Sequence, residues 1–181
     1  GFPMALLDQA LENSKNLFAT GEFVTKLGSL VNIVTDSKNA LSAYDLTSYY
    51  TDGLSGILAD LGIQTKIIDN PIKNAPPFLI GKRIESSELK TILLYGHGDT
   101  VPLQKDLWNE GINPRELKIV DEKIYGRGVA DNKGQHLINL LALLSVLKTR
   151  KKLGFNIKII FEMGEEVGST GLFELCGQYK D

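Results

Sequence analysis

The sequence predicts an α/β protein in which a mostly parallel sheet is flanked by helices. Short apolar runs typical of buried strands alternate along the chain with longer segments whose apolar residues recur at helical spacing. Such alternation favours a parallel sheet with helical connections. At 181 residues and 43% hydrophobic composition, the chain is also long enough to enclose a substantial core.

Helices are predicted in the N-terminal third of the chain. Apolar residues recur at helical spacing over residues 5–34, and Thr20-Gly21 divides this segment into two pieces. A further helix is predicted over residues 46–61, and Gly62 supplies its C-terminal stop. We therefore expect a helical region to precede the first strand.

Strands are predicted from the middle of the chain onward. The first two cover residues 63–68 and 78–84. Residues 91–95 are continuously apolar, which predicts a central strand buried on both faces. The same criteria predict a hairpin, a leucine-rich helix, a buried strand and a last helix, over residues 117–125, 137–147, 155–161 and 170–175.

Composition excludes several classes of protein. The net charge of −2 gives no electrostatic footprint for nucleic acid. No run of about 18 apolar residues is present, so no membrane span is predicted. The chain shows no secretory signal and a single cysteine, Cys176, which we expect to pack in or near the core. These features favour a soluble, cytoplasmic protein.

Acidic and imidazole side chains stand just after the predicted strands, among glycines. His97 and Asp99 follow the strand at 91–95, and Glu165-Glu166 follow the strand at 155–161. Asp131 lies in a glycine-containing loop just before a predicted helix. Because ligands gather at the carboxyl ends of strands in open α/β sheets, we expect these residues to meet in one cleft.

One imidazole and several carboxylates are the donors expected of a divalent metal site. They suit Zn²⁺, with Mn²⁺ or Co²⁺ as other occupants. An aspartate such as Asp131 can bridge two metals, and of the two adjacent glutamates one can bind metal while the other faces a bound water. Asp99 lies two residues from His97, close enough to accept a hydrogen bond from its ring and to orient it.

Each residue alone has a simpler interpretation. A lone histidine in a loop is more often a surface or hydrogen-bonding residue than a ligand, and paired glutamates are usually solvated. Their occurrence together, at successive strand ends, favours the metal site. The sequence contains neither a phosphate-binding GxxxxGK[ST] loop nor an HExxH helix. His136, near the start of the leucine-rich helix, is predicted to have a capping or surface role.

The motifs LLYGHGDTVP, YGRGVADNKG and FEMGEEVGS resemble those of the M20 metallopeptidase family, in the order found there. The family includes acetylornithine deacetylase, succinyl-diaminopimelate desuccinylase, aminoacylases, carboxypeptidase G and carnosine-type dipeptidases. The resemblance implies a zinc-peptidase-like catalytic domain that holds two Zn²⁺ ions.

By this resemblance, His97 binds one metal, Asp131 bridges both, and Glu166 binds the other. The catalytic pair is Glu165, the general base and acid, and Asp99, which orients His97. The family often has a second acidic residue after the bridging aspartate, and here that position is Asn132. The resemblance also implies a cis peptide bond between Asp131 and Asn132.

The resemblance further implies that residues 4–181 form the N-terminal portion of a catalytic domain. The family's lid domain, which often mediates homodimerisation, and its remaining ligands would lie outside this chain. We therefore expect a parent enzyme that hydrolyses amide bonds of peptides or N-acyl amino acids, and a chain that is inactive by itself. The alternative is a non-catalytic fragment that serves only as a folding or interaction module.

Overall fold

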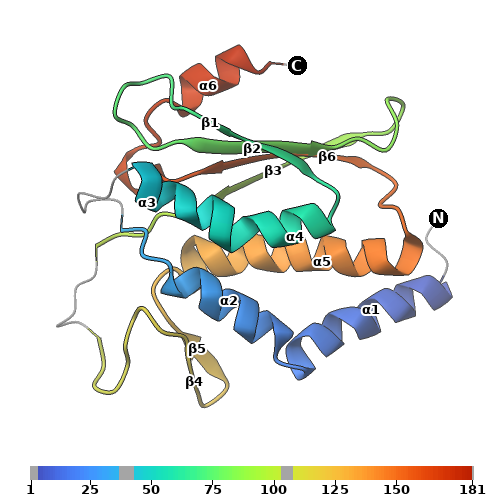
Figure 1. The fold of residues 1–181 in the computed structure, drawn as a ribbon. Helices are drawn as coiled ribbons and strands as arrows, with labels where there is room; N and C mark the ends of the chain where they lie inside the picture. Colours follow the sequence, from blue (N-terminus) through green and yellow to red (C-terminus); the bar gives the residue numbers. More distant parts are fainter. Residues whose placement is uncertain (1–3, 37–42, 103–107, 181) are drawn as a thin grey trace.

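A four-stranded sheet with helices layered beneath one of its faces organises the computed structural model, which describes residues 4–36, 43–102 and 108–180 (Figure 1). Helices α4 (Ser55–Asp60) and α5 (Gly134–Arg150) lie directly under the sheet. Helices α1 (Met4–Ala19) and α2 (Glu22–Asn32) form a further layer below them. This arrangement confirms the α/β class predicted from the sequence.

The strand pairing is mixed, which corrects the prediction of a mostly parallel sheet. Strands β1 (Gln64–Ile68), β2 (Phe78–Arg83), β6 (Asn156–Glu162) and β3 (Thr91–His97) are neighbours in that order. Only the β3–β6 pair is parallel, whereas β1–β2 and β2–β6 are antiparallel. No helix lies between β1 and β2, and a short connection of this kind returns the chain in the opposite direction.

The strand predicted to be central lies at the edge of the described sheet. β3 pairs with β6 on one side, and its apolar side chains are partly open, with Leu93 61% and Ile92 43% exposed. β6 instead lies between two strands, and its residues Ile157, Ile159 and Phe161 are buried. An apolar run predicts burial, but it does not specify which strands lie on either side.

The predicted helices are present, with local departures from regular geometry. α1 and α2 are separated near Gly21, whose φ of +78° is a conformation that glycine adopts at little cost. The helical segment after residue 43 has three parts, α3 (Ala43–Ser48), a π-helical turn η1 (Tyr49–Leu54) and α4. The last helix, α6 (Leu172–Gln178), lies on the opposite side of the sheet from α5 (Figure 1).

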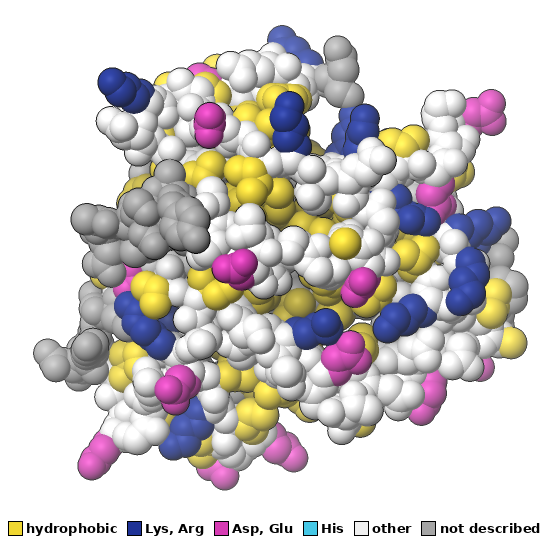
Figure 2. Space-filling view, viewed as in Figure 1, with side chains coloured by type: hydrophobic (Ala, Val, Ile, Leu, Met, Phe, Trp, Pro, Cys, Tyr) yellow, Lys and Arg dark blue, Asp and Glu magenta, His cyan; other side chains and the backbone are white. Residues whose placement is uncertain are grey.

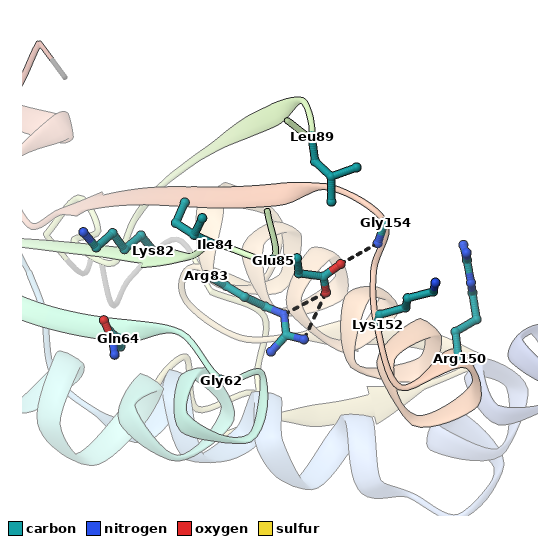
Figure 3. Close-up of a pocket in the computed structure, with 10 residues that line it drawn as sticks. All are labelled: Gly62, Gln64, Lys82, Arg83, Ile84, Glu85, Leu89, Arg150, Lys152 and Gly154. Atoms are coloured by element: carbon teal, nitrogen blue, oxygen red, sulfur yellow. Dashed lines mark hydrogen bonds and ion pairs between the residues drawn. The ribbon is translucent and has the colours of Figure 1, made fainter. Parts of the chain in front are cut away.

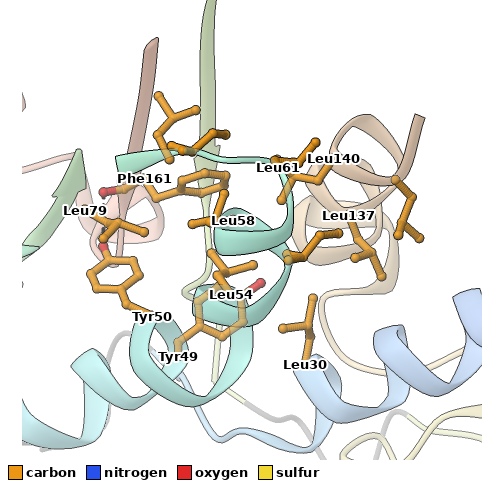
Figure 4. Packing of buried hydrophobic residues seen from close by; sticks show 14 of the residues in the cluster. Leu30, Tyr49, Tyr50, Leu54, Leu58, Leu61, Leu79, Leu137, Leu140 and Phe161 are labelled. Atoms are coloured by element: carbon orange, nitrogen blue, oxygen red, sulfur yellow. Dashed lines mark hydrogen bonds between the residues drawn. The ribbon is translucent and has the colours of Figure 1, made fainter. Parts of the chain in front are cut away.

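The main core lies between the sheet and the helices beneath it (Figure 4). Helical leucines meet aromatic rings and strand residues there, and burial of each such side chain contributes about 1.5–3 kcal/mol relative to exposure. Tyr50 is buried too, and its hydroxyl donates to the carbonyl of Phe161 at 3.0 Å. The labelled members of this cluster include Leu30, Tyr49, Leu54, Leu58, Leu61, Leu79, Leu137 and Leu140.

A small hairpin, β4 (Lys118–Val120) with β5 (Lys123–Tyr125), confirms the prediction for residues 117–125. Its two turn residues, Asp121 and Glu122, both have positive φ, as a two-residue hairpin turn requires. Cys176 is exposed on α6, so the prediction that it packs in or near the core is wrong.

Acidic and basic side chains are interspersed on the face of the molecule shown in Figure 2, with apolar side chains visible between them. Among the described residues, no helix has the length and apolar character needed to cross a membrane.

Candidate metal centre

His97 is the last residue of β3, and the parallel pairing of β3 with β6 places it opposite Glu162. Its imidazole is almost fully buried. The backbone N–H of Gly98 donates to the carbonyl of Glu162 at 3.0 Å, which completes the β3–β6 ladder at His97. The β3–β6 register therefore fixes where the imidazole stands.

Asp99 contacts both that imidazole and the glutamate pair. The Nδ1 atom of His97 lies 3.1 Å from the carbonyl oxygen and 3.3 Å from a carboxylate oxygen of Asp99, so it can donate to them and leave Nε2 free to face the cluster. The buried carboxylate of Asp99 also accepts from the backbone N–H groups of Glu165 at 3.2 Å and Glu166 at 3.0 Å. One side chain thus joins two motifs that are far apart in the sequence.

Asp131 reaches the same place from the loop before α5. It lies in a short turn, η3 (Val129–Lys133), in which its own backbone is extended. A carboxylate oxygen stands 3.1 Å from Nε2 of His97, and the side chain is 72% exposed. The peptide bond between Asp131 and Asn132 is cis, as the family resemblance implied.

The two glutamates come from a 3₁₀ turn, η4 (Glu165–Val167), just after β6. Ligand atoms of His97, Asp131 and Glu166 all lie within 4.8 Å of one another. A carboxylate oxygen of Glu165 stands 3.7 Å from Nε2 of His97. The structure therefore brings all five residues predicted from the sequence together at one rim of the sheet.

The charges of this cluster act on one another. Burial lowers the pKa of His97, but the hydrogen bonds and charge of Asp99, with a smaller contribution from Asp131, outweigh burial and raise it to about 9. Burial, followed by the negative charges of Asp131 and Glu165, raises the pKa of Glu166. A bound cation would relieve this repulsion between carboxylates.

The donor set fits a divalent metal. One imidazole nitrogen and the carboxylate oxygens of Asp131 and Glu166 are ligands that Zn²⁺ accepts, and their separation allows them to share an ion. The contact between Asp99 and the far ring nitrogen of His97 is the support that metal-binding histidines usually have. The two-residue spacing in the sequence permitted this contact, and the family resemblance implied it.

Sequence reasoning missed the buried polar residues behind the cluster. His136 is only 3% exposed, so the prediction of a capping or surface role for it is wrong. Lys133 is also buried, and its ammonium donates to the carbonyls of Leu30 and Ile33, each at 3.1 Å. The pattern around His136 held one usable signal, because Asn132 and His136 are four residues apart at the start of a helix and so share a face.

Two cavities lie at different places along the sheet. One of about 230 Å³ adjoins the cluster and is lined by residues that include Thr100, Arg127, Asp131 and Glu166. A larger one, about 840 Å³, lies away from the cluster, where α5 ends and β6 begins (Figure 3). Its lining contains the ion pair of Arg83 and Glu85, 3.0 Å apart. We expect the chemistry at the smaller cavity because two of the candidate ligands, Asp131 and Glu166, line it.

Known proteins are similar to this chain in both sequence and fold. The Beta-Ala-His dipeptidase of Mus musculus is 35% identical over 88% of this chain and 34% of its own length. The Cys-Gly metallodipeptidase of Candida albicans is 28% identical over 97% of this chain and 37% of its own length. The crystal structure of human carnosine dipeptidase 1 superposes with a TM-score of 0.80 at 30% identity, covering all of this chain and 39% of the other.

The chain thus spans about a third of the length of these two dipeptidases, 34% and 37% respectively. The family model for peptidase family M20/M25/M40 matches residues 93–181, the segment that contains the whole cluster from His97 to Glu166. Sequence, fold and motif agree, and the chain belongs to this M20 peptidase family.

Proposed function

We propose that the protein to which this chain belongs is a metal-dependent hydrolase that cleaves the amide bond of a dipeptide or an N-acyl amino acid. The observation that carries the proposal is the convergence of His97, Asp131 and Glu166 within 4.8 Å, with Glu165 beside them. Membership of a peptidase family supports amide bonds as the target.

In this proposal His97 and Glu166 would each hold one Zn²⁺ ion and Asp131 would serve both, with Mn²⁺ or Co²⁺ as other occupants. The bound metal would supply Lewis acidity, which lowers the pKa of a water molecule from about 15.7 to about 7. The exposed carboxylate of Asp131 and the partly exposed one of Glu165 both face the solvent side, where a substrate can approach.

Glu165 is the proposed proton carrier. Its carboxylate takes a proton from the attacking water and returns it to the leaving amine, which contributes about 10²–10⁴-fold to the rate in other enzymes. Asp99 has a positioning role, because it holds the ring of His97 and the backbone of Glu165 and Glu166 at once.

Dipeptides are the favoured substrate class. The names of the relatives, Beta-Ala-His dipeptidase and Cys-Gly metallodipeptidase, support this choice over N-acyl amino acids. The cavity of about 230 Å³ beside the cluster offers room for part of a small substrate. The homodimer and the cytoplasmic location expected from the sequence stay predictions.

The test uses the full-length protein, a panel of dipeptides and N-acetyl amino acids, and a metal chelator. We expect hydrolysis of at least one dipeptide, loss of turnover after metal removal, and recovery when Zn²⁺, Mn²⁺ or Co²⁺ is restored. Turnover that survives complete removal of metal would contradict the proposal.

The isolated chain tests the alternative of a non-catalytic folding or interaction module. Because the chain spans about a third of its relatives, we expect it to bind metal weakly and to hydrolyse no substrate. Paired, stoichiometric zinc and turnover in the isolated chain would rule out the module interpretation.

A further inference from the structure

A buried line of polar groups runs behind the metal centre. The hydroxyl of Tyr49 contacts Nε2 of His136, and Nδ1 of His136 lies 2.9 Å from Oδ1 of Asn132. The same oxygen of Asn132 accepts from the backbone N–H of His97 at 3.1 Å. These groups come from η1, α5, η3 and β3, so the line connects elements that are distant in the sequence.

The hydrogen bonds permit only one tautomer of a neutral His136. The backbone N–H of His97 can only donate, so the Asn132 atom that faces it is the carbonyl oxygen. The Nδ1 atom of His136 faces that same oxygen and must therefore carry the hydrogen. Nε2 is then left with a lone pair, which accepts from the hydroxyl of Tyr49.

The surroundings favour this neutral form of His136. The imidazole is 3% exposed and meets the ring of Phe161 edge-on at 5.1 Å. Burial, followed by the positive charges of His97 and Lys133, lowers the pKa of His136 to about 3. Burial also raises the pKa of Tyr49 well above its usual value, so its hydroxyl keeps its proton and can donate.

Packing ties the far end of this line to the metal-site loop as well. A Cβ atom on Gly98 would collide with two ring atoms of Tyr49, so the ring lies directly against the loop that follows His97. Asn132, in the middle of the line, is bonded to Asp131 in the chain. The line therefore contacts both sides of the cluster.

We propose that His136 is a positioning residue of the metal site, which uses its Nδ1–H to hold Asn132 and thereby fixes the backbone of His97 and the loop that carries Asp131. The inference rests on the proposed function, because it assigns His97 and Asp131 to the metals. Tyr49 completes the interaction, because its hydroxyl donates to Nε2, the ring nitrogen that carries no hydrogen.

Two variants of the full-length protein separate the two ring nitrogens. His136→Asn keeps an N–H donor close to the position of Nδ1, whereas His136→Gln places its amide near Nε2 and removes the donor to Asn132. With zinc chloride as the only added ligand, we expect His136→Gln to weaken zinc affinity about 10- to 100-fold, as loss of a supporting residue does elsewhere. His136→Asn retains the donor to Asn132, so we expect it to weaken zinc affinity less than about 3-fold, well below that range.

Two measurements on the metal-free protein do not depend on activity. Nitrogen-15 spectra of labelled histidine should show His136 neutral with hydrogen on Nδ1, with its signals assigned by their loss in His136→Asn. Amide hydrogen exchange at His97 should accelerate in His136→Gln but not in His136→Asn. If His136→Gln fails to fold, Tyr49→Phe provides the test: it removes the hydrogen bond that holds Nε2 of His136, so amide exchange at His97 should become faster.

An Nε2–H tautomer in the wild-type protein would overturn the inference. So would equal losses of zinc affinity in the two variants, since that result would indicate a packing role alone. If the full-length protein binds no zinc, the proposed function fails, while the tautomer and the exchange rate of His97 still decide whether His136 positions this loop.

Discussion

The sheet has charged residues near both of its ends, and the two groups are balanced in different ways. At one end, Glu85 is enclosed by Arg83 and by the backbone N–H groups of Leu153 and Gly154 at 2.8 Å each. At the other end, the carboxylates of Asp131 and Glu166 gather around His97. The charge of Glu85 is balanced by groups within the chain, whereas the clustered carboxylates of Asp131 and Glu166 suit a bound cation.

The pKa values of two glutamates express this difference. Burial raises the pKa of Glu85, but hydrogen bonds from Leu153, Gly154 and Arg83 outweigh burial and lower it. Burial and neighbouring carboxylates together raise the pKa of Glu166. Structural charges are arranged to stabilise the fold, while the crowding of like charges at the rim suits a site that binds a cation.

The largest expected effect is at the rim. Glu165→Gln in the full-length protein should reduce kcat about 10²–10⁴-fold, because the amide cannot accept the proton that the reaction releases. Zinc content, measured by atomic emission, should be unchanged. Glu174→Gln, an exposed residue on α6, serves as the control. Normal turnover in Glu165→Gln would show that the assignment of the proton carrier is wrong.

Asp131→Asn should reduce zinc affinity by about 100-fold or more. Loss of a residue that only supports a metal ligand costs about 10- to 100-fold, and a ligand itself should matter at least as much. The reason is that a negative oxygen shared by both proposed ions is replaced by a neutral amide. Competition with a chromophoric chelator measures the change. Asp121→Asn in the β4–β5 turn is the matched control and should have no effect. Unchanged zinc affinity in Asp131→Asn would refute the bridging role.

The opposite end should respond in stability rather than in metal binding. Glu85→Ala leaves Arg83 and two backbone N–H groups without their acceptor, so the free energy of unfolding should fall by about 2–3 kcal/mol. Urea denaturation measures the loss, with exposed Glu88→Ala as the control. A variant with wild-type stability, or one with reduced zinc affinity, would remove the contrast between the two ends.

A pH titration of stability sharpens the contrast further. His136 has a folded-state pKa of about 3, below the value of about 6.5 in an unfolded chain, so between these values the unfolded chain binds the extra proton. Stability is therefore lost as pH falls through this window, by about 1.4 kcal/mol per pH unit from this residue alone. The difference in unfolding free energy between wild type and His136→Asn should show that slope, and a flat difference would argue against a neutral, buried imidazole.

Local sequence patterns were sufficient for much of this structure. Helical periodicity located α5, and glycines beside His97 and Glu165 marked the strand ends where function gathers. These features are local, since a strand end and a helix face are determined within about ten residues. The roles assigned to Asp99 and Asp131 depended on resemblance to a family and stay predictions.

Long-range features were not accessible from sequence. The edge position of β3 depends on which strands pair, and the run at 91–95 is equally apolar at an edge or in the centre. The burial of His136 depends on Tyr49, which is 87 residues away in the sequence. The exposure of Cys176 reflects where α6 lies relative to the sheet, which a single cysteine does not encode.

The parallel register of β3 with β6 has a consequence for anyone who transplants this centre into another protein. His97 stands opposite Glu162, three residues before Glu165, and a slip of one residue would move one strand by about 3.3 Å and turn its side chains to the other face. A graft of the glycine-rich loops alone would lose this alignment. The smallest portable unit is the strand pair in its native register, together with both loops and the η3 turn that carries Asp131.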